Sequence, residues 1–173
     1  MVTIRRATTN DAAPITESHV RSWQSAYRGL IPQDYLDSLD PAQRLVVRQQ
    51  ILASVNWAVG GVLVAEDESG LTGFADFGPT RDADKDPSLV GEIRAIYLAP
   101  AAWGQGHGRE LMAAALDGLT TVGYGEATLW VLDSNKRARR FYEAAGFRAD
   151  GSVKEYEGLG FTLPEVRYRR PLP

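Results

Sequence analysis

The sequence contains no cysteine and only two histidines, His19 and His107. Without cysteine, the chain has no disulfide framework, no thiolate nucleophile and no thiolate metal site. Two histidines far apart in the sequence are too few for a histidine-based zinc site. We therefore expect no bound metal and no cysteine-based catalysis.

Long hydrophobic runs and an excess of basic charge are also lacking. The longest apolar run, Trp57 to Ala65, is far too short to cross a bilayer, and the opening segment MVTIRRATTND has no apolar stretch typical of a signal peptide. The formal net charge is −3 and the pI about 5.4, so no basic field indicates nucleic-acid binding. We expect a cytoplasmic protein that binds neither a membrane nor a nucleic acid.

The residues that are present have the balance of a globular protein, with 44% hydrophobic and 24% charged side chains. The length of 173 residues fits one domain, spanning residues 1–173. Asp11 is a plausible N-cap for a first helix with Pro14 in its first turn, and Gly29 ends that helix. The remaining patterns predict further helical segments near 32–39 and 41–52, from about 109, and at 135–146. They predict strands at 2–7, 92–99, 126–133 and 166–170, and a hairpin of strands 62–67 and 71–78.

This order predicts an α/β fold of the α+β type with a mixed sheet. The sheet is antiparallel around the hairpin, and it is parallel where a helix separates strand 92–99 from strand 126–133. Ligands in such sheets favour the carboxyl ends of strands. Residues 104–108 and 133–135 follow two of these strands, so we expect the binding site there.

Three glycines at alternate positions, Gly104, Gly106 and Gly108, separate a strand from a helix. Such a turn directs free backbone N–H groups and the helix dipole at one point, which suits a phosphate. A Walker A loop would need Lys-Ser or Lys-Thr where Arg109 and Glu110 stand, and a dinucleotide fingerprint would need G-x-G-x-x-G early in the chain. The alternative is a tight turn that needs glycine for its geometry alone.

Two segments in combination resemble the GNAT acyltransferases, a superfamily that moves an acyl group from acyl-coenzyme A to an amine. IYLAPAAWGQGHGRELM is similar to the family's Q/R-x-x-G-x-G/A loop, with Trp103 in place of Gln or Arg. VLDSNKRARRFYEAAGF is similar to its N-x-x-A-x-x-F-Y-x-x-x-G-F signature, read from Asn135 to Phe147. The two cover roughly residues 90 to 150, and their order is more specific than either segment alone. The resemblance implies a mostly antiparallel, twisted sheet with flanking helices and a splayed parallel strand pair that binds acyl-CoA.

The resemblance also implies a set of residues that bind acetyl-CoA, the acyl donor. Backbone N–H groups of the glycine loop would hold the pyrophosphate, strand residues would pair with the pantetheine arm as an added strand does, and Asn135 would reach the pantetheine. An N-cap is an equally good interpretation of Asn135. The implied residues are Ile96, Tyr97, Leu98, Gly104, Gln105, Gly106, His107, Gly108, Arg109 and Asn135.

Acyl transfer to an amine needs a base for the ammonium, a donor for the oxyanion and a proton for the leaving thiolate. Tyr142 resembles the family's general acid; alone it would be interpreted as a core aromatic. The resemblance makes Glu92 the best candidate base, acting through a water; the alternatives are a salt bridge with Arg94 or an ordinary solvated charge. His19 is an alternative base that fits a core histidine better. Strand alternation predicts Glu92, Arg94, Ile96 and Leu98 on one face. A backbone N–H near Ile96 or Tyr97 would hold the oxyanion.

The acceptor is not identified by these patterns. Trp23 and Tyr27 share a helical face one turn after His19, which suggests a wall of the acceptor site or, equally, plain core. Acceptor-side helices would span about residues 10–54 and the acyl-CoA-binding core about residues 90–150. Asp82, Asp84 and Asp86 read as a solvated loop, with a faint indication of a cationic acceptor.

The sequence thus predicts an N-acetyltransferase that works by direct attack in a ternary complex, with a small-molecule or protein amine as acceptor. A coenzyme A-binding sensor domain without turnover is the alternative, and a homodimer stays open.

Overall fold

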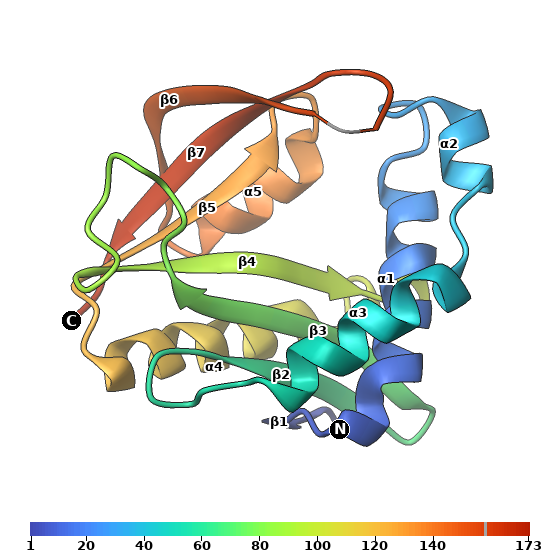
Figure 1. Ribbon diagram of the computed structural model, residues 1–173, viewed down its shortest axis with the longest axis horizontal. Coiled ribbons are helices and arrows are strands. Elements are labelled where there is room, and N and C mark those ends of the chain that lie inside the picture. Colours follow the sequence, from blue (N-terminus) through green and yellow to red (C-terminus); the bar gives the residue numbers. More distant parts are fainter. Residues whose placement is uncertain (158) are drawn as a thin grey trace.

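The computed structural model describes residues 1–157 and 159–173 (Figure 1). None of the described helices is long and apolar enough to span a membrane. The helices are η1 (Thr9–Asp11), α1 (Ala12–Ala26), α2 (Gln33–Asp37), α3 (Pro41–Ala53), η2 (Pro100–Ala102), α4 (His107–Val122) and α5 (Lys136–Ala144). The strands are β1 (Thr3–Arg6), β2 (Gly61–Asp67), β3 (Gly70–Pro79), β4 (Val90–Leu98), β5 (Glu126–Leu132), β6 (Arg148–Tyr156) and β7 (Leu163–Pro171).

The strands form one seven-stranded sheet in the order β1-β2-β3-β4-β5-β7-β6. All neighbours are antiparallel except β4 and β5, which are parallel. Only Val90, Gly91 and Glu92 of β4 pair with β5, and beyond them the two strands diverge into the V visible in Figure 1. The predicted mixed, mostly antiparallel sheet with a splayed parallel pair is therefore confirmed.

Alternation along β2 divides the core between the two faces of the sheet. Leu63 and Ala65 pack in a cluster with α4 and with the apolar side of α5, whereas Val62 and Val64 pack in a second cluster with α1 and α3. The residues expected to be buried on α4 are Leu111, Met112, Ala115, Leu116 and Leu119, and all five are buried. Helices α4 and α5 thus pack on one face of the sheet, and α1 and α3 pack on the other.

A β-bulge on β4 changes the face on which its side chains lie. Asp76 pairs with Ala95 and the next residue of β3, Phe77, pairs with Ile93, so Arg94 is the extra residue. Ile93 and Ile96 both pack on the α4 side, and a Cβ on Gly91 would also meet α4. Glu92 therefore points to the α1 side, and the prediction that it shares a face with Ile96 and Leu98 is wrong because strict alternation does not hold across a bulge.

Two further local expectations need correction. Asp11 directly precedes α1, but its carboxylate binds Arg5 at 2.8 and 2.9 Å and the Thr8 backbone N–H at 2.7 Å instead of capping that helix. Strand β6 is absent from the predicted elements, because it is an edge strand with mostly exposed side chains and so lacks the apolar alternation of a buried strand. The expected cap of α3 is confirmed, since Asp40 accepts the Ala42 N–H at 2.9 Å.

The packing of α4 on the sheet yields a stability prediction at Gly118. Replacing a mid-helix glycine with alanine normally stabilises a helix by up to about 1 kcal/mol. At Gly118 the added Cβ would lie 2.6 Å from the Phe77 ring, which is buried in the core. We expect Gly118→Ala to destabilise the fold by about 1–3 kcal/mol, measured by urea denaturation. Thr121→Ala, on the exposed side of α4, is the control and should be neutral or stabilising.

Candidate functional site

The divergence of β4 and β5 opens a cavity of about 800 Å³. Its lining comes from α1, β4, β5, α5 and β7, and it includes the candidate residues Trp23, Tyr27, Glu92, Asn135 and Tyr142. Ile96, Tyr97 and Leu98 lie along the β4 edge that no longer pairs with β5, and they line the same cavity. An extended ligand can therefore meet the free backbone groups of β4 where a strand would otherwise pair.

The glycine turn leads from η2 into the N-terminus of α4. The backbone N–H groups of residues 104 to 108 have no acceptor among the described residues. Gly104 and Gly106 adopt positive φ angles of 75° and 89°, and at both positions the space that a Cβ would occupy is open, with no other atom within 4 Å. Five consecutive free donors at a helix N-terminus make this turn suited to an anion such as a pyrophosphate.

Gly108 is needed for a different reason. A Cβ on Gly108 would lie 2.8 Å from Leu98 and 3.3 Å from Phe141, so this glycine lets the start of α4 pack closely on β4 and α5. His107 likewise turns its side chain inward: it is buried, and its Nδ1 lies 3.0 Å from the Thr72 hydroxyl. Only the backbone of His107 is therefore available to a ligand at the turn.

A second cavity of about 700 Å³ lies beside the glycine turn. Arg109, Arg137 and Arg170 line it together with Gly104, Gly106 and Gly108, and it shares Leu98, Trp103, Arg137 and Phe141 with the first cavity. Cationic guanidinium groups next to free backbone donors suit a phosphorylated ligand. The two cavities together fit an elongated molecule with phosphates at one end and an uncharged arm at the other, as coenzyme A has.

Trp103, the departure from the family's loop pattern, has two structural contacts. Its indole N–H donates to the Leu98 carbonyl at 3.0 Å, and the Arg137 guanidinium lies 3.8 Å from its ring centroid. The indole thus ties the end of β4 to the turn and holds Arg137 against the cavity wall.

Of the two interpretations of Asn135, the structure shows the N-cap and is compatible with the contact to a ligand. Its side-chain oxygen accepts the Ala138 N–H at 3.1 Å, so it is the N-cap of α5. The same residue lines the cavity between β4 and β5. A cap that uses only the carbonyl oxygen leaves the amide NH₂ available to a ligand.

Tyr142 projects from α5 into the lining of the cavity while its ring packs on Phe141 and Phe147. Its hydroxyl has no hydrogen-bond partner within the described part of the chain. Burial, with a contribution from nearby Tyr97, raises the pKa of the Tyr142 phenol well above its ordinary value. Tyr142 is therefore protonated at neutral pH and its hydroxyl can donate a hydrogen bond, whereas the raised pKa makes it a weaker acid than an ordinary tyrosine.

Glu92 lies on the floor of the cavity, 2% exposed, and is bound by Arg81 rather than by Arg94. The Arg81 side chain donates to both carboxylate oxygens at 2.7 and 3.2 Å, and its backbone N–H donates at 3.0 Å. Burial alone would raise the pKa of Glu92, but Arg81 outweighs it and holds that pKa below the usual range. Glu92 is thus ionised but weakly basic.

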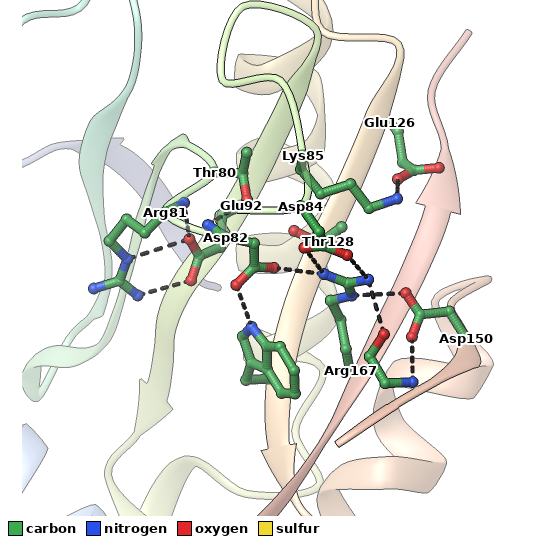
Figure 2. Close-up of polar contacts among 12 residues, drawn as sticks. Thr80, Arg81, Asp82, Asp84, Lys85, Glu92, Glu126, Thr128, Asp150 and Arg167 are labelled. Carbon is green, nitrogen blue, oxygen red and sulfur yellow. Dashed lines mark hydrogen bonds and ion pairs between the residues drawn. The ribbon is translucent and has the colours of Figure 1, made fainter. Parts of the chain in front are cut away.

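The aspartate segment is solvated only in part: the Asp82 side chain is largely buried, which corrects the interpretation for that residue, whereas Asp84 and Asp86 are exposed as expected. Figure 2 shows Asp82 and Asp84 converging with Asp150 on Arg167, at 2.7–3.1 Å. Asp82 also accepts the Trp130 indole N–H at 2.9 Å. The segment is thereby fixed to β5, β6 and β7, and Arg167 offsets one of the three negative charges that converge on it.

An aromatic wall formed by His19, Trp23, Tyr27, Phe74 and Tyr97 closes the α1 side of the cavity. The His19 ring stacks on Tyr97 at 4.8 Å, and Trp23 meets Tyr27 edge-on at 4.9 Å. Burial, with Arg44 and Arg48, lowers the pKa of His19 to about 3. His19 is therefore neutral and a very weak base at neutral pH, which disfavours it as the catalytic base.

The comparisons with known proteins fit this geometry. A family model described as "Acetyltransferase (GNAT) family" matches residues 20–147. An uncharacterized N-acetyltransferase of Bacillus subtilis, YuaI, is 36% identical over 148 residues, which are 83% of this chain and 79% of that protein. The chain belongs to the GNAT acetyltransferase family. It is accordingly an acyl-CoA-dependent N-acetyltransferase that uses acetyl-CoA as co-substrate and an amine as acceptor.

Solved GNAT structures share the fold over the whole chain. The acetyltransferase yncA of Salmonella typhimurium, determined with acetyl-CoA, has a TM-score of 0.73 at 23% identity and covers 100% of this chain and 95% of its own. The PaiA N-acetyltransferase of Thermoplasma acidophilum, determined with coenzyme A, has a TM-score of 0.72 at 21% identity, with 99% of both chains covered.

Several residues of this GNAT site have no signal in the sequence. Arg81 and Arg167 stand in a polar loop and a terminal strand, and their partners are distant along the chain. Glu165 on β7 also lines the large cavity. Within the described ranges, no group of three or more His, Cys, Asp or Glu side chains could hold a metal ion.

The glycine turn gives a matched test of anion binding. Gly106→Asp and Gly106→Asn introduce side chains of equal shape, and both residue types tolerate a positive φ, so only the charge differs. We expect the aspartate variant to bind acetyl-CoA at least tenfold more weakly than the asparagine variant, which is about 1.4 kcal/mol, by calorimetry. Equal affinities in two folded variants would contradict a pyrophosphate at this turn.

His19 gives a prediction of pH-dependent stability. The folded pKa of about 3 lies below the ordinary value of 6.5, so below pH 6.5 the unfolded chain binds a proton that the folded chain does not. Stability should therefore fall as the pH drops from 6.5, by up to about 2 kcal/mol at pH 5. His19→Phe keeps a stacking ring and should remove this part of the loss. Urea denaturation at pH 7 and pH 5 measures it, and equal losses in both proteins would contradict it.

Proposed function

We propose that this chain transfers the acetyl group of acetyl-CoA directly to a primary amine within a ternary complex. The observation that carries the proposal is the meeting of two cavities at Leu98, Trp103, Arg137 and Phe141. One cavity has the free donors of the glycine turn, and the other has the free edge of β4, Tyr142 and the aromatic wall. A donor and an acceptor can therefore approach the same point from opposite sides of the sheet.

The donor side would use the residues that the sequence indicated. The backbone N–H groups of Gly104, Gln105, Gly106, His107 and Gly108 would hold the pyrophosphate, with Arg109 beside them. Ile96, Tyr97 and Leu98 would pair with the pantetheine through the free β4 edge, although the Leu98 carbonyl is already bound by Trp103. The Asn135 amide NH₂ would complete the pantetheine site. When bound, acetyl-CoA supplies the thioester that reacts.

The proton transfers can be assigned to groups at the cavity. The ammonium loses a proton to a base, and the neutral amine nitrogen then forms a bond to the thioester carbon while the carbon–sulfur bond breaks. The Tyr142 hydroxyl would give its proton to the departing sulfur, and the second proton lost by the nitrogen would restore Tyr142. A backbone N–H near Ile96 or Tyr97 would stabilise the negative charge that develops on the carbonyl oxygen.

Glu92 is the base that the family resemblance suggests, working through a water. Its place on the cavity floor supports this role, whereas its pairing with Arg81 and its lowered pKa reduce its basicity. Trp23 and Tyr27 would border the acceptor. Burial raises the pKa of Tyr27 well above its ordinary value, so the hydroxyl stays protonated and can donate a hydrogen bond.

The direct experiment is a set of primary amines, including amino acids, polyamines, aminoglycosides and peptides, incubated with acetyl-CoA while free thiol is measured. Amine-dependent thiol release that follows sequential rather than ping-pong kinetics is expected. A folded protein that binds acetyl-CoA and acetylates no amine would instead indicate a coenzyme A-binding sensor.

Tyr142→Phe tests the proton donor. The change removes one hydroxyl and keeps the ring, so we expect kcat to fall by about 10²-fold or more while the Kd for acetyl-CoA changes little. Tyr124→Phe is the control, because the Tyr124 hydroxyl donates to the Val59 carbonyl at 2.9 Å on another side of the molecule. That variant should lose about 1 kcal/mol of stability and keep its kcat. An unchanged kcat in Tyr142→Phe would make Tyr142 a packing residue.

A further inference from the structure

Three carboxylates line the large cavity, and two of them already have cationic partners. Glu92 is bound by Arg81, and Asp82 is bound by Arg167 and the Trp130 indole. The third, Glu165, has neither a hydrogen bond nor an ion pair to any described residue. A partly buried carboxylate without a partner is costly unless a ligand supplies one.

Glu165 lies where the cavity faces the acceptor side. On β7 it is directly opposite Leu132, at the end of β5 that has diverged from β4. Directly opposed residues of antiparallel strands point to the same side of a sheet, and Leu132 packs with Ile31 and Leu36 beneath α1 and α2. Glu165 therefore faces the aromatic wall of Trp23, Tyr27 and Tyr97, and not the side of the glycine turn.

The basic residue nearest to Glu165 along the sheet does not neutralise it. Lys154 of β6 is its cross-strand partner, but the Lys154 ammonium lies 4.1 Å from the centroid of the Trp130 ring. The distance between Lys154 and Glu165 exceeds that of a salt bridge, since no such pair occurs in the described part of the chain. Lys154 is also exposed, so its charge is screened by solvent.

We infer that Glu165 receives the ammonium group of the acceptor, binding it and taking its proton before the amine attacks. This inference rests on the proposed acetyl transfer and assigns its acceptor-binding carboxylate. The acceptor is then a primary amine that enters as a cation. The ammonium R–NH₃⁺ and the Glu165 carboxylate become the amine R–NH₂ and a carboxylic acid, which returns its proton to solvent after the transfer.

The surroundings of Glu165 favour this role over Glu92. Tyr27 of α1, Tyr97 and Glu92 of β4, Arg81 of the preceding loop, and Lys154 and Tyr156 of β6 face the same cavity. Burial, reinforced by Glu92 and opposed by Lys154 and Arg81, raises the pKa of Glu165 above its ordinary value. A raised pKa makes this carboxylate the better proton acceptor near neutral pH.

A binding experiment tests the inference without knowledge of the natural acceptor. Protein labelled with ¹³C at the glutamate carboxyls and saturated with coenzyme A is titrated with butylammonium chloride, with butanol of the same chain length as the control. Glu165→Gln identifies the Glu165 signal. We expect butylammonium to shift that signal and lower its apparent pKa, whereas butanol leaves it in place. A signal that responds to both probes alike, or to neither, overturns the inference.

A kinetic experiment separates this inference from the proposed function. With an amine that the native enzyme acetylates, Glu165→Gln should lower kcat/KM at pH 7 at least tenfold, and the loss should shrink by pH 9.5 as the free amine becomes abundant. The acetyl-CoA Kd should stay unchanged. Glu155→Gln, an exposed change on β6 outside the cavity, should match the native enzyme.

The other outcomes are distinct. Native kinetics in Glu165→Gln, or a loss that is constant with pH, overturns the role of Glu165 while leaving acetyl transfer intact. If kcat/KM recovers at high pH in Glu92→Gln but not in Glu165→Gln, then Glu92 rather than Glu165 accepts the proton of the ammonium. Absence of acetylation by the native enzyme contradicts the proposed function itself, and the carboxyl titration then still decides whether Glu165 binds an ammonium.

Discussion

The early end of the pairing between β4 and β5 is the constraint on which the site depends. Three residue pairs join the strands at their start, and beyond Glu92 each strand keeps a neighbour on one side only. Buried backbone groups without partners are rare in proteins because each costs free energy. Here the unpaired backbone groups of β4 line the cavity, where a ligand can form hydrogen bonds with them. The interruption of strand pairing therefore creates the candidate binding site.

Several contacts, some of them remote in sequence, fix the walls of the opening between the diverging strands. Arg167 holds the segment with Asp82 and Asp84 across the β5 side of the opening, and Asp82 in turn fixes the Trp130 indole (Figure 2). Trp103 ties the end of β4 to the glycine turn through the Leu98 carbonyl. The bulge at Arg94 places Glu92 on the α1 side of the sheet, opposite Ile96 and Leu98. These contacts position the walls, so a ligand need not organise the cavity when it binds.

Two of the three carboxylates that line the cavity have an arginine partner. Arg81 neutralises Glu92, whereas Arg167 is shared by Asp82, Asp84 and Asp150 and offsets only one of their three negative charges. Buried charges usually require such partners, because removal from water is costly. Two features without a partner among the described residues bear on the proposed function: the free N–H groups of the glycine turn, and the Glu165 carboxylate on the opposite side. The first calls for an anion and the second for a cation, as a coenzyme A thioester and an ammonium would supply.

Local patterns in the sequence determined most of the fold and the donor side of the site. Apolar spacing identified α1, α4, α5 and the hairpin of β2 and β3, because these elements bury one regular face. The glycine spacing and the segment from Asn135 to Phe147 identified the turn and Tyr142, since both are contiguous motifs. The side chains of edge strand β6 are mostly exposed, so its sequence has no alternation of apolar and polar residues that would identify a strand. Only the tertiary structure decided that Arg81 rather than Arg94 pairs with Glu92, and that Arg167 binds Asp82, Asp84 and Asp150. It also decided that Glu165 has no partner among the described residues. Which charged residues pair across strands depends on strand register, bulges and the order of strands in the sheet. The spacing of residues within one segment carries no information on these features.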